Sequence, residues 1–220
     1  MTILEPSCVA SLMSILSMSM NARSAQEGRS YFSEPGGKTK LGRQLFPESV
    51  SIRSDPSSPL APGMPWGEES LPQAPRTWID RGRVSSLFCD RFWAHKQERE
   101  AVPPASNLLM SGGQGSLDEL IADTRRGVLI TSLFYIRFVD PRTLLLTGLT
   151  RDGVFWIENG KLSHPVTNFR WNESPIRVLE NVDAMTAAVR APPREDMDTT
   201  MVVPALRVKE FELSSVSDAV

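Results

Sequence analysis

The chain has 220 residues, 40% of them hydrophobic, which is enough for one large domain or two small ones around a sizeable core. Its formal charge of −2 and its isoelectric point near 5.8 argue against nucleic-acid binding, because a nucleic-acid-binding domain needs a basic face. The composition predicts a soluble globular protein. Two cysteines, Cys8 and Cys89, allow at most one disulfide, so we expect a reducing compartment.

The N-terminal residues predict a short strand followed by a buried helix. Ile3-Leu4 indicates the end of a strand, and Ser7 to about Ala22 indicates a helix with Pro6 at its first turn. This uncharged run is not a signal peptide, because Glu5 precedes it in place of a basic residue and serines interrupt it. It is also too short to span a bilayer. A strand so close to residue 1 suggests that the chain begins inside something larger.

Loops dominate the next part of the chain. Residues 24–42 predict a polar loop interrupted by two apolar residues, Tyr31 and Phe32. The glycines of this loop do not have the spacing of a phosphate-binding loop. Ser49 to Ile52 predicts a short edge strand. Asp55 to Pro75 holds six prolines and predicts a long ordered surface loop. Loops of this length inside a compact domain commonly have a function of their own or cover a functional site.

A hairpin and a capped helix precede the most apolar part of the chain. Thr77 to Cys89 predicts the hairpin, with its turn at Asp80-Arg81-Gly82, and residues 92–104 predict a charged, exposed excursion. The spacing of Ser116 and Glu119 predicts a capping box that opens a short helix.

Residues 127–171 hold the longest apolar runs and predict an antiparallel meander of about four strands, against which the rest of the chain packs. The expected strands are Val128 to Val139, Leu144 to Leu149, Val154 to Ile157 and Val166 to Trp171. The expected turns are Asp140-Pro141, Arg151-Asp152-Gly153 and Asn159-Gly160.

The C-terminal part completes an α+β fold. Ser174-Pro175 predicts a helix that continues to about Met185, residues 191–200 predict a polar linker, and Val202 to Phe211 predicts a last strand before a tail at 216–220. We therefore expect residues 1–220 to form a mostly antiparallel, barrel-like β domain with a few short flanking helices.

Residues with catalytic chemistry are few. His95 lies in a charged segment and His164 precedes Pro165, and neither has a second ligand at a metal-binding spacing. Cys89 follows Leu87-Phe88 in a strand pattern, which suits a buried apolar residue better than a thiolate nucleophile. Neither a nucleophile elbow nor a dinucleotide-binding glycine motif occurs. Motifs alone therefore assign no role to this chain.

Six segments together resemble the C-terminal half of the TldD/PmbA family. They are residues 28–33 (GRSYFS), 40–46 (KLGRQLF), 77–92 (TWIDRGRVSSLFCDRF), 116–161 (from SLDELIADTRRG to FWIENGK), 168–182 (NFRWNESPIRVLENV) and 203–220 (VPALRVKEFELSSVSDAV). The resemblance implies a cytoplasmic metallopeptidase assembly, historically named a modulator of DNA gyrase, in which two subunits form a barrel that takes in unfolded peptides. It also implies that an N-terminal α/β half would precede Thr2, so we expect a split subunit or a truncated gene product.

The zinc site implied by the resemblance is not matched by this chain. TldD-type members carry a His-Glu-x-x-x-His helix and a later cysteine, and the corresponding positions here are Ser14, Ile15 and Ser19. Serine is a poor zinc ligand, and isoleucine cannot activate water. No cysteine follows Cys89, and the 191–200 linker occupies the expected region of the third ligand. This pattern resembles the metal-free PmbA branch, also called TldE, so we expect no catalytic residue and no metal here, with zinc in a TldD-type partner.

Three interpretations follow from the resemblance. The first is a non-catalytic PmbA/TldE-like subunit that pairs with a TldD-like subunit or with itself and handles peptide substrates, with no nucleic-acid or membrane partner. Peptide would then bind along strand edges that the sequence does not identify. The second is an active metallopeptidase with another ligand set, including His95 or His164. The third is a truncated, inactive fragment.

Overall fold

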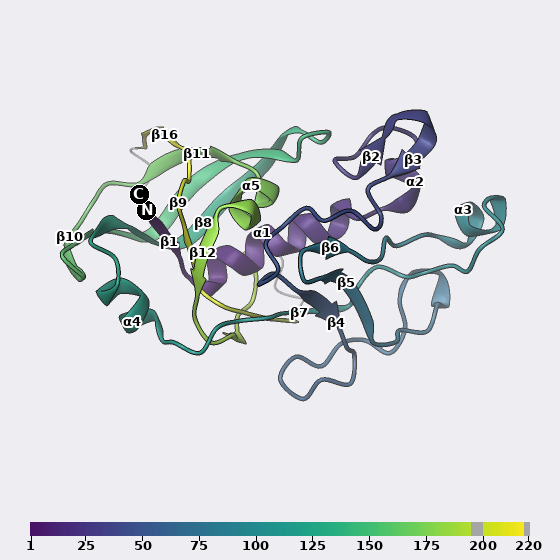
Figure 1. The fold of residues 1–220 in the computed structure, drawn as a ribbon, viewed down its shortest axis with the longest axis horizontal. Helices are drawn as coiled ribbons and strands as arrows, with labels where there is room; N and C mark the ends of the chain where they lie inside the picture. The colour runs from purple at the N-terminus through teal and green to yellow at the C-terminus, as the bar shows by residue number, and fades with distance from the viewer. Residues whose placement is uncertain (195–199, 218–220) are drawn as a thin grey trace.

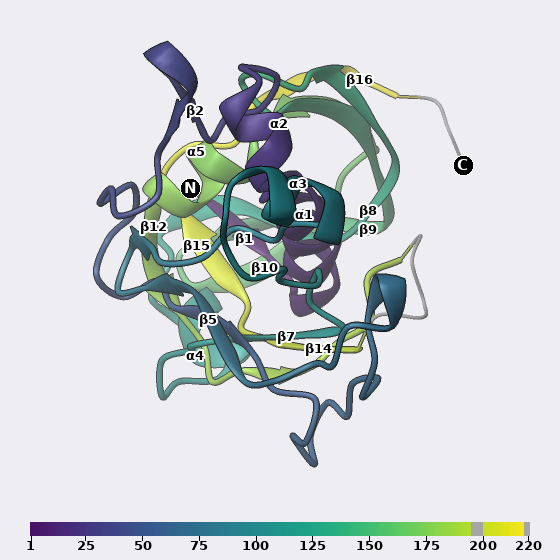
Figure 2. The ribbon, with the colours of Figure 1, turned by 90° about the vertical axis from the view of Figure 1, so that its right-hand side faces the viewer.

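The computed structural model describes residues 1–194 and 200–217, in which two open β-sheets enclose one central helix (Figure 1). This helix, α1 (Pro6–Ser19), packs against strand β8 (Arg126–Asp140) of the larger sheet and strand β14 (Thr200–Val203) of the smaller one. Figure 2 shows α1 in the interior, with β8 on one side and β14 below it. The expected strand and helix at the N-terminus are confirmed.

The larger sheet has eight strands, and it contains the strands of residues 127–171 that the sequence predicted as its most apolar part. Its order is β12 (Val182–Met185), β15 (Leu206–Val208), β1 (Thr2–Leu4), β8, β9 (Leu145–Glu158), β11 (Phe169–Glu173) and β16 (Leu213–Val216), with β10 (Lys161–Pro165) paired to β9. All its pairs are antiparallel except that of β1 with β8.

The smaller sheet has six strands and lies on the other side of α1. Its order is β13 (Val189–Arg190), β14, β7 (Asn107–Met110), β4 (Ile52–Ser54), β5 (Arg76–Asp80) and β6 (Arg83–Val84). A separate two-stranded ribbon joins β2 (Ser33–Glu34) to β3 (Lys38–Thr39). Within the described ranges neither large sheet closes on itself, so the α+β, mostly antiparallel class is confirmed as two open sheets without a closed barrel.

The remaining helices are short and flank the sheets. They are α2 (Ala22–Gln26), α3 (Arg91–Lys96), α4 (Leu117–Ala122) and α5 (Pro175–Glu180), with 3₁₀ turns at Pro35–Gly37 and Glu68–Ser70. In the part of the chain that the structure describes, no helix has the length and apolar character needed to cross a membrane.

Local sequence signals predicted several elements correctly. Ser116 Oγ accepts the N–H of Glu119 at 3.2 Å, and the Glu119 carboxylate accepts the N–H of Ser116 at 2.7 Å, which confirms the capping box. Asn159 and Gly160 have φ values of 51° and 75° and make the predicted tight turn between β9 and β10. The hairpin at Asp80-Arg81-Gly82 is also confirmed, between β5 and β6.

The predicted turn at Arg151-Asp152-Gly153 is wrong. The chain runs straight through it as β9, and Asp152, with a φ of 65°, is part of a bulge where Ile130 and Ser132 of β8 face Val154 and Arg151. Since β9 is long, β10 and β11 both pair with its second edge, so the block is not a simple meander.

Four further predictions need correction, three of them because strand pairing overrode the local pattern. The helix predicted to Met185 ends at Glu180, and Val182–Met185 pairs with β15. The single strand predicted over Val202 to Phe211 is divided between the two sheets as β14 and β15. The predicted edge strand near Ile52 is β4, which lies between β5 and β7. The exposed excursion at 92–104 contains part of α3, whose Trp93 is buried.

Two predictions fall partly outside the described residues. The linker at 191–200 includes residues 195–199, and the tail at 216–220 includes residues 218–220, which the structure does not describe. The strand that follows the linker, β14, begins at Thr200.

Candidate functional site

Helix α1 passes from the interior to the surface, and the candidate site lies where it emerges. Its residues from Cys8 to Ser14 are all buried because the two sheets enclose them, whereas Met18 is 58% exposed. The Ser11 hydroxyl donates to Ser7 O at 3.0 Å, and the Ser19 hydroxyl donates to Ile15 O at 2.8 Å. These hydroxyl groups are therefore bonded within the helix.

Two pockets meet between α1 and the far end of β8, and we call them together the α1–β8 groove. The first has a volume of about 250 Å³ and is lined by Ser11, Ser14, Ile15, Met18, Ile136, Phe138 and Pro193. The second has a volume of about 220 Å³ and is lined by Met18, Ser19, Asn21, Ser24, Arg29, Ser30, Phe138 and Pro141. Met18 and Phe138 line both pockets, so they mark the junction between the two.

Arg194 anchors the segment that closes one side of the groove. Its backbone N–H donates to Ser11 Oγ at 3.1 Å, and its guanidinium donates to Ser132 Oγ at 2.9 Å. The guanidinium also forms an ion pair with Asp152 and lies 5.3 Å from the ring centroid of Phe134. These contacts hold Pro193 beside α1.

The three helix positions singled out by the resemblance all line the α1–β8 groove. Ser14 and Ile15 lie in the first pocket, together with Pro193 from the 191–200 segment, and Ser19 lies in the second. The side chains at these positions do not fit zinc, which binds cysteine sulfur, histidine nitrogen and carboxylate oxygen. Isoleucine offers no donor atom at all.

The other candidate ligands do not come together. His95 lies in α3 and His164 in β10, and Figure 1 shows these elements at opposite ends of the molecule's longest axis. Cys8 and Cys89 are both buried and free, and burial beside Glu5 raises the pKa of the Cys8 thiol far above its usual range. Within residues 1–194 and 200–217, no three His, Cys, Asp or Glu side chains are grouped closely enough to hold a metal ion.

Comparison with known proteins identifies the family of this chain. The sequence profile of the PmbA/TldA metallopeptidase C-terminal domain matches residues 1–215. The chain belongs to the TldD/PmbA family. A curated relative of this TldD/PmbA chain, a metalloprotease of Methanothermobacter thermautotrophicus, is 24% identical over 163 residues, covering 69% of this chain and 36% of the relative.

Solved structures share the fold of this TldD/PmbA domain. A protein of Bacteroides thetaiotaomicron named as a modulator of DNA gyrase has a TM-score of 0.80 at 22% identity, covering 98% of this chain and 46% of its own. TldE of Thermococcus kodakarensis has a TM-score of 0.78 at 19% identity, covering 96% of this chain and 49% of its own. The chain thus spans less than half the length of these relatives.

Sequence reasoning found the α1 side of the groove and the 191–200 segment, which contributes Pro193, and it missed the β8 side. The resemblance identified Ser14, Ile15 and Ser19, but nothing in the local pattern connected them to Phe138. The available signal was weak: Phe138 is an apolar residue, 50% exposed, near the end of a strand.

Proposed function

We propose that this chain is a metal-free, PmbA/TldE-like part of a cytoplasmic TldD/PmbA-type peptidase assembly that processes unfolded peptides, with the zinc held by a TldD-like partner. The observation that carries the proposal is the composition of the groove. The three α1 positions implied by the resemblance converge there, yet they hold two serines and an isoleucine, which cannot bind zinc or activate water.

The groove has the character of a peptide-binding surface. An extended peptide presents every second side chain on the same face, and two small pockets that meet at one point suit two such side chains. Met18 and Phe138 supply exposed apolar surface at the junction, and Ser19 and Asn21 add polar groups in the second pocket. We infer that this groove holds part of an unfolded peptide while the partner subunit carries out the hydrolysis.

The first experiment measures metal and partner binding. The chain, purified without chelator, is analysed by inductively coupled plasma mass spectrometry alone and after mixing with a TldD-type partner on a size-exclusion column. We expect no stoichiometric zinc in the isolated chain and co-elution with the zinc-bearing partner. Stoichiometric zinc in the isolated chain would contradict a metal-free role, and separate elution of the two chains at micromolar concentration would contradict the assembly.

The second experiment tests the groove. Fluorescein-labelled casein, an unstructured chain, is titrated with the protein and followed by fluorescence anisotropy. We expect Phe138→Asp and Met18→Asp each to weaken binding about tenfold or more, because a charge then replaces apolar contact surface. Leu162→Asp is the matched control, since Leu162 is similarly exposed but lies in β10. Equal affinities in all three variants and the unaltered chain would remove the groove from the proposal.

A further inference from the structure

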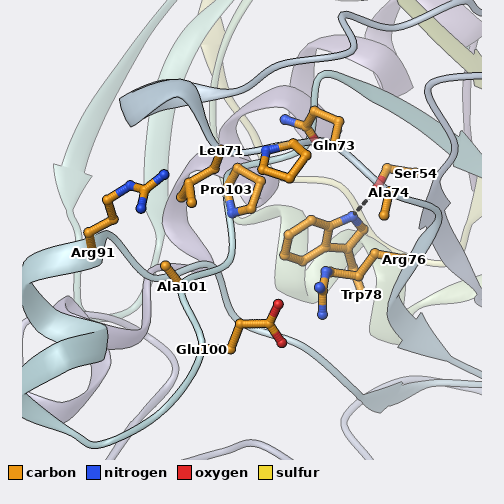
Figure 3. Close-up of a pocket in the computed structure, with 11 residues that line it drawn as sticks. Ser54, Leu71, Gln73, Ala74, Arg76, Trp78, Arg91, Glu100, Ala101 and Pro103 are labelled. Carbon is orange, nitrogen blue, oxygen red and sulfur yellow. Dashed lines mark hydrogen bonds between the residues drawn. The ribbon is translucent and has the colours of Figure 1, made fainter.

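A separate pocket of about 300 Å³ lies beside the smaller sheet (Figure 3). Strand β5 provides Arg76 and Trp78, which are two positions apart and therefore lie on the same face of the sheet. The Trp78 indole N–H donates to Ser54 Oγ at 3.0 Å, so the ring is held in one orientation at the pocket. This pocket shares no residue with the α1–β8 groove.

Hydrogen bonds between distant segments hold the pocket walls in place. Gln73 Nε2 donates to Pro104 O at 2.7 Å, which joins the proline-rich loop to the segment after α3. The backbones of Cys89 and Val102 exchange two hydrogen bonds of 2.8 and 2.9 Å, which secure that second segment. The pocket is thus formed before any ligand arrives, and a preformed pocket avoids much of the entropy loss of binding.

Backbone strain occurs in the two residues that precede Leu71 of the pocket wall. Glu69 and Ser70 have φ values of 54° and 56°, a region that non-glycine residues rarely occupy. The Glu69 carboxylate accepts the backbone N–H of Arg91 at 2.7 Å, and the Arg91 side chain donates to Glu69 O at 3.3 Å. Strained residues cluster at ligand-binding sites, where the surrounding contacts hold them.

Two opposite charges face the pocket without protein partners. Arg76 and Glu100 both line it, and among the described residues neither side chain forms an ion pair or a hydrogen bond. In Figure 3 their charged ends point into the same space below the Trp78 indole. Leu71 and Pro103 form the apolar wall above this space. Arg91 also lines the pocket, but its side chain already donates to Glu69 O. The pocket therefore combines an apolar surface with one cation and one anion, Arg76 and Glu100, that have no partner among the described residues.

We propose that this pocket binds a small zwitterion, a free amino acid or dipeptide. Its carboxylate pairs with Arg76, its ammonium group pairs with Glu100, and its side chain packs against Leu71 and Pro103. A guanidinium binds a carboxylate through two parallel hydrogen bonds, and a carboxylate binds an ammonium group at short range. A simple anion such as phosphate is disfavoured by Glu100, and an internal peptide segment lacks both charges. A volume near the lower end of the range for ligand pockets also favours a small molecule.

The test is a calorimetric titration of the full chain with L-alanyl-L-alanine, its N-acetyl derivative and its C-terminal amide. We expect the free dipeptide to bind about tenfold or more tightly than either derivative, because each derivative lacks one charge-assisted hydrogen-bonding group. Arg76→Gln should abolish the preference for the carboxylate over the amide, and Glu100→Gln should abolish the preference for the free amine over the acetylated one. Thermal melts of both variants verify that they fold.

Matched controls separate this pocket from the groove. Arg125→Gln and Glu48→Gln remove exposed charges outside the pocket and should leave both preferences intact. This inference does not rest on the proposed function, because the pocket shares no residue with the groove. Phe138→Asp should therefore leave dipeptide affinity unchanged. Absence of saturable dipeptide binding would overturn the inference. Unchanged preferences in Arg76→Gln and Glu100→Gln, or loss of dipeptide binding in Phe138→Asp, would overturn it equally.

Discussion

The backbone N–H of Arg194 donates to the hydroxyl of Ser11 at 3.1 Å, joining residues 183 positions apart in the chain. The Arg194 side chain adds a hydrogen bond to Ser132, an ion pair with Asp152 and a contact with the ring of Phe134. The segment before residue 195 is thereby attached both to α1 and to the β8–β9 pair.

Arg194→Ala removes the side-chain contacts and leaves the backbone bond to Ser11. We expect the free energy of unfolding to fall by about 1–2 kcal/mol, the sum expected for one hydrogen bond and a partly exposed ion pair. Urea denaturation at low and high salt measures it, and the difference should shrink at high salt because ions screen the pair with Asp152. The exposed Arg190 of β13 provides the control Arg190→Ala. Equal losses in the two variants would contradict the anchoring role of Arg194.

Ser54→Ala leaves the buried indole N–H of Trp78 without its acceptor. We expect a loss of about 1–3 kcal/mol, the cost of an unsatisfied buried donor. Trp78→Phe removes the donor, so the double variant should lose less than the sum of the two single variants. Denaturation followed by far-ultraviolet circular dichroism gives all four stabilities. Additive losses would show that this hydrogen bond contributes nothing measurable.

The position of Gly82 requires glycine both for its backbone conformation and for lack of space, whereas the position of Gly36 requires it only for its backbone conformation. Both have positive φ values, 78° and 75°, but a Cβ at Gly82 would lie 2.0 Å from Phe46 O, whereas nothing lies within 4 Å at Gly36. Gly36→Ala should cost about 1–2 kcal/mol, the usual penalty for a left-handed L-residue. Gly82→Ala should cost clearly more, because the backbone at Phe46 must move. Thermal unfolding of the pair tests this, and similar melting temperatures would contradict it.

Glu173 makes stability depend on pH. Burial raises the pKa of its carboxyl above the ordinary 4.5, although the N–H of Ser174 and the charge of Arg177 act in the opposite direction. A carboxyl with a higher pKa in the folded state binds its proton more tightly there. Its contribution to stability is therefore largest below the unfolded pKa and is lost as the pH rises through the folded pKa.

The comparison with Glu173→Gln isolates this contribution. The stability of the unaltered chain minus that of the variant should fall as the pH rises from 4.5 toward neutrality, by at most about 1.4 kcal/mol per pH unit. Urea denaturation across this range measures the slope. A difference for Glu173→Gln that rises with pH would contradict the direction of the pKa shift.

The sequence by itself determined the elements whose energetics are local. The Ser116–Glu119 capping box, the Asn159-Gly160 turn and the serine cap of α5 at Ser174 each depend on atoms within three residues, so each is readable from a short stretch. The apolar run of α1 likewise predicted a buried helix. Family resemblance placed Ser14, Ile15 and Ser19 on that helix, and their chemistry alone showed that zinc does not fit there.

Only the tertiary structure decided which segments pair and which side chains meet. Arg151 to Gly153 reads as a turn, but pairing with β8 makes it a bulge, and Val182–Met185 reads as helix until β15 pairs with it. The groove brings together Met18 and Phe138, and the separate pocket beside the smaller sheet brings together Arg76 and Glu100. The two residues of each pair come from segments with no shared local pattern. Such contacts depend on the packing of the whole chain, which no short stretch of sequence encodes.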